Sequence, residues 1–235
     1  MATLSSLVTA IQNILQDAAY NDQYLTEQIN DAVSNIAAGI RMPNGEVSPP
    51  LPDLYACSTV NTDTMLPCVP LPGDYQRGLF NVFDNTNYQI LPPRGGDYYA
   101  FSRFIKQINQ LNLSEAGEVY RVCVKGSNLY YQGIPTVSTT LGVHYYRKPV
   151  PMALDGDAPD GIPEHLAGSM IKHYVVKEVM GEKIEDGQDN MGVGTKYHTA
   201  KFFEDMTDLI DFIGREGEPL YYGSGGYEDR GACDG

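Results

Sequence analysis

The chain has 235 residues, of which 42% are hydrophobic and 20% are charged, so it is large and apolar enough to bury a core. Its formal net charge of −14 argues against a protein that wraps nucleic acid, because binding phosphates requires the opposite charge. No segment approaches the roughly 20 consecutive apolar residues of a membrane span, and the first residues lack the basic region of a cleaved signal. We therefore expect a globular protein without a membrane partner.

The negative charge is concentrated in the two ends of the sequence. Residues 1–40 contain four acids and no Lys or Arg, whereas residues 41–152 contain nine bases and eight acids. Residues 153–203 contain nine acids against five bases, and residues 204–235 nine acids against two. The middle of the chain is thus close to neutral. An acidic surface of this kind can still face DNA, because it repels the strand and lets it slide.

Residues 1–45 are predicted to form two helices. The first is interrupted at Tyr20-Asn21-Asp22, and the second begins near Asp22 to Thr26, both plausible N-caps, and ends near Gly39. Their apolar residues recur at helical spacing. The two stripes comprise Leu4, Leu7, Val8, Ile11, Ile14 and Leu15, then Leu25, Ile29, Ala32, Val33 and Ile36.

Residues 46–152 are predicted to form an inserted β-rich domain, which opens with a proline-rich linker at 46–53. Short strand-like segments follow, separated by Gly, Pro, Asn and Asp, and prolines break several of them, which favours a small antiparallel sheet or sandwich. Residues 101–108 fit a short helix or a strand equally well. The strand candidates are Met65–Val69, Leu79–Phe83, Tyr88–Leu91, Val119–Lys125, Leu129–Tyr131 and Leu141–Tyr146.

The clearest β-pattern lies in residues 118–151. Tyr120, Val122 and Val124 alternate with polar residues, the turn Gly126-Ser127-Asn128 tolerates positive φ, and the chain returns at Leu129. A further strand stops before Pro149, because proline cannot donate to a ladder. This region predicts a hairpin and not a catalytic centre.

Residues 153–214 are predicted to form a helix pair that packs with the N-terminal helices. Pro163 is placed at the first helical position of the third helix, and the fourth extends from about Gly194 to Ile213 with Gly214 as its C-cap. The stripes are Leu166, Met170, Tyr174 or Ile171, Val175 and Val179, then Tyr197, Ala200, Phe203, Met206, Ile210 and Ile213. The element order predicts an α+β fold: a layer of about four helices from both ends of the chain, a small inserted antiparallel β-domain and an extended C-terminal arm.

The sequence predicts no catalytic residue, no metal site and no cofactor. His165 and His173 are eight residues apart, too far for a shared metal ion, and His144 and His198 fall on other elements, so each histidine is expected at the surface or an interface. The glycine-rich loop 187–196 lacks the lysine of a phosphate-binding loop.

The four cysteines have no zinc-site spacing, which favours free thiols in a reducing cytoplasm and leaves a Cys57–Cys68 bridge open. Carboxylate pairs such as Glu115 with Glu118 do not identify a hydrolase by spacing alone.

Residues 215–235 are glycine-rich and lack periodicity, so we expect a flexible arm that becomes ordered on a partner. Aromatic rings separated by glycine and flanked by acids suit such binding. The anchor candidates are Leu220, Tyr221, Tyr222, Tyr227 and Arg230.

The order of these parts resembles head-to-tail adaptor (connector, or head-completion) proteins of short-tailed bacteriophages. The resemblance covers roughly residues 3–214 and is carried by four segments: TLSSLVTAIQNILQDAAYNDQYLTEQINDAVSNIAAGI, LPGDYQRGLFNVFD, VYRVCVKGSNLYYQGIPTVSTTLGVHYYRKPVPM, and GIPEHLAGSMIKHYVVKEVMGE with YHTAKFFEDMTDLI. Each segment is degenerate, and their order is more specific than any one of them.

The resemblance implies a structural virion protein of the head-tail junction, assembled in the cytoplasm of a bacterial host. Such adaptors form a twelve-fold ring beneath the portal protein, extend the channel for genomic DNA, and provide a platform for tail nozzle and tail fibre proteins. The arm is then expected to reach the portal, and a hairpin surface of Asn128, Tyr130, Tyr131 and Tyr146 to face the tail. Two alternatives stay open: a tail-accessory protein with cell-wall hydrolase activity, and a tail nozzle or tube component.

Overall fold

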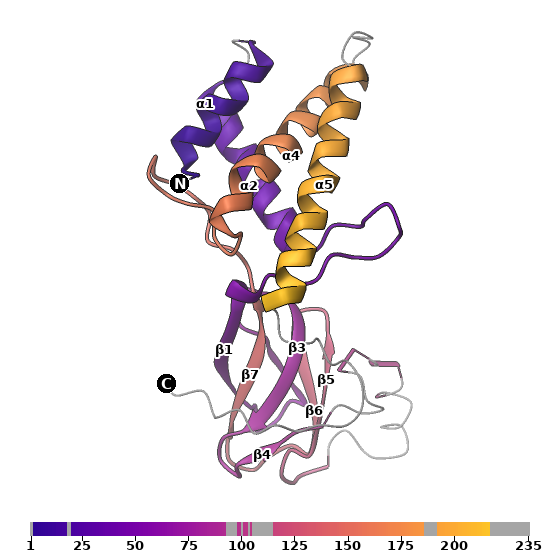
Figure 1. Cartoon of the computed structure of the whole chain (residues 1–235). Helices are drawn as coiled ribbons and strands as arrows, with labels where there is room; N and C mark the ends of the chain where they lie inside the picture. The colour runs from indigo at the N-terminus through magenta and orange to yellow at the C-terminus, as the bar shows by residue number, and fades with distance from the viewer. Residues whose placement is uncertain are drawn as a thin grey trace. The chain divides into compact units, whose positions relative to one another are not determined.

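The computed structural model describes residues 2–17, 20–92, 98–99, 101–102, 104, 115–185 and 192–216. These residues fall into two compact units (Figure 1). The helical unit lies within Met1–Leu54 and Lys148–Pro219, and the β unit lies within Tyr55–Arg147. The predicted α+β class is confirmed, because the described residues form four α-helices and two antiparallel sheets.

Helix α1 (Leu4–Leu15) begins with a reciprocal cap. The Thr3 hydroxyl accepts the Ser6 N–H at 3.4 Å, and the Ser6 hydroxyl oxygen accepts the Thr3 N–H at 2.9 Å. Two N–H groups that have no partner inside the helix are thereby satisfied. Burial of Leu4, Leu7, Val8, Ile11 and Leu15 confirms most of the predicted stripe.

Helix α2 (Asp22–Ala38) buries the predicted stripe from Leu25 to Ile36, but its cap was misplaced. The N-cap is Asn21, whose side-chain oxygen accepts the Tyr24 N–H at 2.8 Å. Asn21 lies in extended backbone, which leaves its amide in reach of the first turn, whereas Asp22 is already helical.

Helices α4 (Glu164–Glu185) and α5 (Gly192–Glu216) lie side by side (Figure 1). Helix α4 starts after Pro163, whose carbonyl accepts the N–H groups of Leu166 and Ala167 at 3.0 Å. The predicted C-cap at Gly214 is wrong, because α5 continues through Glu216. Glycine lowers helix stability but does not end a helix whose neighbouring turns are well anchored.

The buried face of α5 differs from the predicted stripe. Met206 and Ile213 are buried as expected, but Tyr197 is 55% exposed and Ala200 also faces solvent. The observed buried face of α5 is rotated relative to the predicted stripe. The reason is that a histidine, which the apolar pattern did not include, lies on the buried side of the first turns. The buried side chains of α5 are His198, Phe202, Met206, Leu209 and Ile213.

Hydrogen bonds join the two halves of the helical unit. The side-chain amide of Asn30 forms two hydrogen bonds with the backbone of Met152. Its nitrogen donates to the Met152 carbonyl at 3.0 Å, and its oxygen accepts the Met152 N–H at 2.8 Å. The Leu4 N–H donates to the Asp157 carbonyl at 2.9 Å. Segments more than a hundred residues apart in sequence are therefore held in register by specific polar contacts.

Three of the four histidines are buried, although each was expected at the surface or an interface. His144, His173 and His198 are each only 7% exposed, and only His165 is exposed. The Nδ1 atoms of His173 on α4 and His198 on α5 lie 2.7 Å apart. A hydrogen bond at this distance requires one nitrogen to carry a proton and the other to be bare. The two rings therefore fit as a neutral or singly protonated pair.

The β unit contains a four-stranded sheet, in the order β1-β7-β3-β4, and a three-stranded sheet, in the order β2-β6-β5. All neighbouring strands are antiparallel. The strands are β1 (Tyr55–Asn61), β2 (Cys68–Pro70), β3 (Tyr75–Asp84), β4 (Gln89–Ile90), β5 (Arg121–Lys125), β6 (Asn128–Gln132) and β7 (Thr140–Arg147).

One apolar core joins the two sheets. It combines residues of the four-stranded sheet, such as Leu79, Val82 and Val143, with residues of the three-stranded sheet, such as Val122 and Leu129. Each sheet contributes the side chains of one face, as in a β-sandwich.

Strand β1 was not predicted from the sequence, and the candidate Met65–Val69 was largely wrong. The segment Tyr55–Asn61 contains few large apolar residues, and it is a strand because all seven of its residues pair with β7. Met65 is in contrast 83% exposed and precedes β2. Tertiary pairing thus overrides local propensity at both positions.

The hairpin of β5 and β6 is confirmed, but its turn is shorter than expected. Asn128 pairs with Lys125, so the turn consists of Gly126 and Ser127, and Gly126 has the positive φ of 59° that such turns require. Of the undecided segment at 101–108, Phe101, Ser102 and Phe104 are helical. None of the described helices is long and apolar enough to cross a membrane.

The free thiols expected at Cys68 and Cys123 are present. The bridge left open between Cys57 and Cys68 does not form, because Cys68 is a free thiol.

The histidine pair predicts that acid destabilises the helical unit. Burial, assisted by Lys172, lowers the pKa of His173 from 6.5 to about 4 and also lowers the pKa of His198. Unfolded histidines bind protons near pH 6.5, so the unfolded state gains protons first as the pH falls. The stabilising contribution of the neutral histidine pair is therefore fully present above pH 6.5. As the pH falls to 4, we expect the free energy of unfolding to decrease by an amount on the order of 2 kcal/mol.

Thermal unfolding followed by helical circular dichroism between pH 7 and 4 measures this loss. The variant His198→Gln should flatten the dependence on pH, and His165→Gln, which changes an exposed histidine, should leave it as in the wild type. A wild-type slope in the His198→Gln variant would refute the assignment.

Gly133 predicts a second sensitive position. Its φ is +88°, and an added Cβ would lie 2.0 Å from the Glu118 carbonyl oxygen. We expect Gly133→Ala to reduce the free energy of unfolding by about 3 kcal/mol or more, because both backbone strain and a steric clash oppose it. In the matched control Gly117→Ala, the added Cβ meets no atom within 4 Å and should change stability little. Equal urea midpoints for the two variants would contradict the expectation.

Candidate functional site

Two of the four residues predicted to face the tail are buried, which corrects their assignment. Tyr131 is fully buried, and its hydroxyl lies 2.7 Å from the Leu66 carbonyl oxygen and accepts the Asp63 N–H at 2.8 Å. Burial raises the pKa of Tyr131 to about 12. Tyr146 is 8% exposed and meets the Tyr55 ring edge-on. Neither ring can present a docking surface in this fold.

The other two hairpin residues are partly exposed. Asn128 is half-buried beside the turn, and the Tyr130 ring packs edge-on against Phe101, with centroids 4.9 Å apart. They keep the tail-facing role only as a prediction. The arm candidates Leu220, Tyr221, Tyr222, Tyr227 and Arg230 lie outside the described residues.

Three connections emerge together at one end of the four-stranded sheet. They are residues 62–67 after β1, 85–88 between β3 and β4, and 133–139 before β7, and we call this surface the loop end. The strand register places them together, because Asn61 pairs with Thr140 and the next β7 residue pairs with the end of β3. The chain enters and leaves the unit at the opposite end of the same sheet.

Hydrogen bonds hold the loops of the loop end to one another. The Thr62 N–H donates to the Thr139 carbonyl at 2.9 Å, and the Thr139 N–H donates to the Thr62 hydroxyl oxygen at 2.8 Å. The Ser138 hydroxyl donates to the Thr62 carbonyl at 2.6 Å, and the Asn85 N–H donates to the Thr140 carbonyl at 3.0 Å. The loops are therefore extensions of the sheet with defined positions.

The loop end exposes large apolar side chains. Met65 is 83% exposed, Leu66 56%, Val137 74% and Tyr88 90%. This surface was not predicted from the sequence, because Met65 and Tyr88 were expected in strands and Val137 had no predicted role. The sequence signal that could have indicated this surface is the presence of large apolar residues in short segments flanked by Pro, Gly and Asn.

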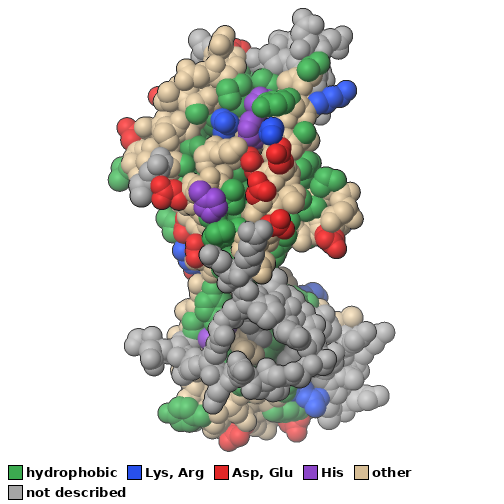
Figure 2. Space-filling view, in the orientation of Figure 1, with side chains coloured by type: hydrophobic (Ala, Val, Ile, Leu, Met, Phe, Trp, Pro, Cys, Tyr) green, Lys and Arg blue, Asp and Glu red, His purple; other side chains and the backbone are tan. Residues whose placement is uncertain are grey.

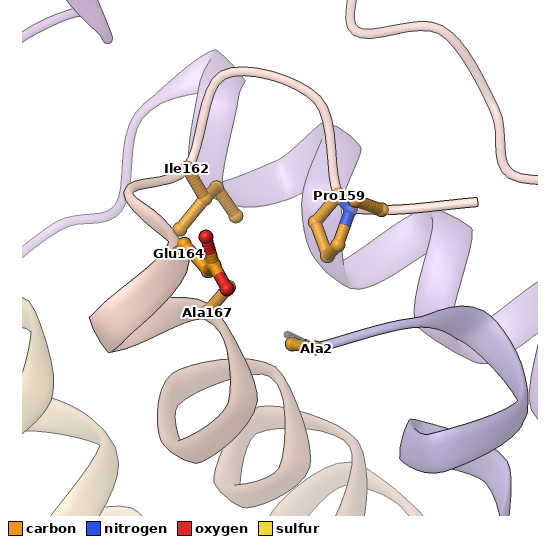
Figure 3. A pocket seen from close by; sticks show the side chains of 6 residues that line it. Ala2, Pro159, Ile162, Glu164 and Ala167 are labelled. Carbon is orange, nitrogen blue, oxygen red and sulfur yellow. The ribbon is translucent and has the colours of Figure 1, made fainter. Parts of the chain in front are cut away.

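One small apolar hollow of about 80 Å³ lies in the helical unit, where Glu164 is the charged group among Ala2, Pro159, Ile162 and Ala167 (Figure 3). This volume is well below that of typical ligand sites. Glu115 and Glu118 are both exposed, so neither side chain lies in an enclosed site.

Polar clusters among the described residues are small. They contain no group of three or more His, Cys, Asp or Glu side chains placed to hold a metal ion. The Tyr55 hydroxyl contacts His144 Nδ1, and the Cys57 sulfur lies 3.6 Å from His144 Nε2. This cluster joins β1 to β7, which gives it a structural role in the sheet.

The sequence was compared with known families and with curated proteins. The sequence model for the SU10 adaptor protein matches residues 2–224, which include both units. No curated protein matches the chain. The match confirms the resemblance to phage head-to-tail adaptors that the order of the segments indicated. The chain therefore belongs to the SU10 adaptor protein family.

Proposed function

We propose that this chain is the head-to-tail adaptor of a short-tailed phage, which forms a ring of about twelve copies beneath the portal. The carrying observation is the family match over residues 2–224, because it spans the helical unit and the β unit together. An adaptor works by fitting its surfaces to neighbouring proteins. It acts in the virion at the head-tail junction, after assembly in the bacterial host.

In this proposal the helical unit contacts neighbouring copies and faces the DNA channel. Acidic side chains gather over this unit (Figure 2), and residues 153–203 contain nine acids against five bases. Like charges repel phosphates within about 10 Å at moderate salt. A channel wall of this composition would keep the genome from adhering during its passage.

The arm supplies the contact with the portal. Leu220, Tyr221 and Tyr222 provide apolar anchors, Tyr227 provides another ring, and Arg230 provides a positive charge. Glycines between the anchors allow the segment to follow a surface before it becomes ordered. The β unit is left to carry the tail proteins.

The proposed ring can be tested by measuring the mass of the assembly before and after portal is added. We expect the purified full chain to be a monomer and to assemble into a ring only when the purified portal ring of the same virion is added, because the portal provides the template. Native mass spectrometry or light scattering gives the copy number. A chain that stays monomeric with portal would refute the proposed function.

Arm variants test the portal contact. The double variant Tyr221→Ser/Tyr222→Ser should weaken portal binding by about tenfold or more, because buried aromatic anchors dominate interfaces. The matched control is Tyr88→Ser, which removes a tyrosine that is 90% exposed in the β unit. The control should bind portal as the wild type does, and equal binding by all three proteins would exclude the arm as the anchor.

A further inference from the structure

We propose that the loop end docks into an uncharged apolar groove of the tail nozzle protein. This inference rests on the proposed function and assigns the tail contact to Met65, Leu66, Tyr88 and Val137. It moves the contact away from the hairpin tyrosines, since Tyr131 and Tyr146 are buried.

The first support is the exposure of four large apolar side chains on one small surface. The loops adjoin the ends of β1, β7 and β3, which are neighbouring strands, so they span roughly 10–15 Å at ordinary strand spacing. Single exposed apolar residues are common on soluble proteins, but a contiguous group on adjacent loops marks an interaction surface.

The second support is preorganisation. The Asp63 carboxylate accepts the N–H groups of Met65 and Leu66 at 2.6 and 2.9 Å, and Tyr131 holds the same loop from below. The loop of Val137 is bonded to this loop through Thr62, Ser138 and Thr139. Side chains on positioned loops lose less conformational entropy on binding than side chains on mobile ones.

The third support is the backbone of Tyr88. Its φ is +54°, a left-handed conformation that favours Gly or Asn, yet the position carries a tyrosine whose ring is 90% exposed. Such strain is typical of functional positions. Folding alone gives no reason for a large aromatic ring here.

The charge of the loop end selects the kind of partner. Its three loops contain no Lys or Arg, and its acid, Asp63, is occupied by backbone N–H groups. Phosphate binding would require basic residues, so DNA does not fit this surface. An apolar groove of another protein does. The loop end lies roughly 25 Å along β7 from the residue where the chain leaves the β unit.

The double variant Met65→Ser/Val137→Ser tests the assignment in the full chain assembled on portal. Binding of purified tail nozzle protein to these rings, measured by surface plasmon resonance, should weaken about tenfold or more. The matched control is Leu154→Ser, which changes a residue of the helical unit that is 71% exposed. The control should bind within about twofold of the wild type.

A second variant separates docking from folding. Tyr88→Asn places a residue that tolerates positive φ at the strained position and removes the ring. We expect its melting temperature to equal or exceed that of the wild type while binding to the nozzle protein weakens severalfold. A purely structural role for Tyr88 would leave that binding unchanged.

The outcomes distinguish this inference from the proposed function. If wild-type rings form on portal and the variants bind the nozzle protein as the wild type does, the assignment of the tail contact to the loop end is wrong. The proposed adaptor function is then unaffected. If wild-type rings form but do not bind the nozzle protein, the inference also fails. If the loop-end variants no longer form rings, the surface is a contact between copies and the inference is overturned. Failure of the wild type to form rings refutes the adaptor proposal itself.

Discussion

Antiparallel pairing of β1 with β7 is the constraint on which both units depend. Tyr55, the first residue of the β unit, pairs with Tyr146, next to its last residue, so the chain leaves and returns to the helical unit at neighbouring positions. A long insertion is tolerated when its ends are held close, because the helices on either side then need no displacement. The same pairing also sets the register that gathers the loops at the far end of the sheet.

The division of polar and apolar groups suits binding by surface complementarity. Buried polar groups are used to join elements: Asn30 holds Met152 within the helical unit, and His144 links β7 to β1 within the β unit. Several exposed large apolar side chains lie in loops, among them Met65, Leu66 and Val137. A surface that binds by complementarity needs fixed backbone positions, and these bonds supply them.

The sequence predicts the helices better than the strands, for a physical reason. The stripes of α1 and α2 are repeated several times along each helix, so one exception such as Ile14, which is only half-buried, does not hide them. Strand β1 contains mostly small and polar residues and exists because β7 pairs with it, which no local pattern reveals. His198 was assigned to the surface by its polarity, although a partner on α4 makes its burial possible.

The candidate site was predicted less well than the fold. The hairpin tyrosines were identified as strand residues, but which face each ring occupies depends on the second sheet, and that sheet buries Tyr131. The loop end is assembled from three separate segments that lie between residues 62 and 139, so sequence spacing alone could not indicate it. The arm was recognised by composition, and its residues after Glu216 lie outside the described residues.

The separation of the two halves of the helical unit has a consequence during synthesis. Helices α1 and α2 leave the ribosome before α4, which begins at Glu164, well over a hundred residues after Ala38. At a translation rate of about 5–20 residues per second, their apolar stripes wait on the order of ten seconds for a partner. During that interval the nascent chain exposes the apolar surface of an amphipathic helical hairpin, to which chaperones and neighbouring nascent chains on the same messenger RNA can bind.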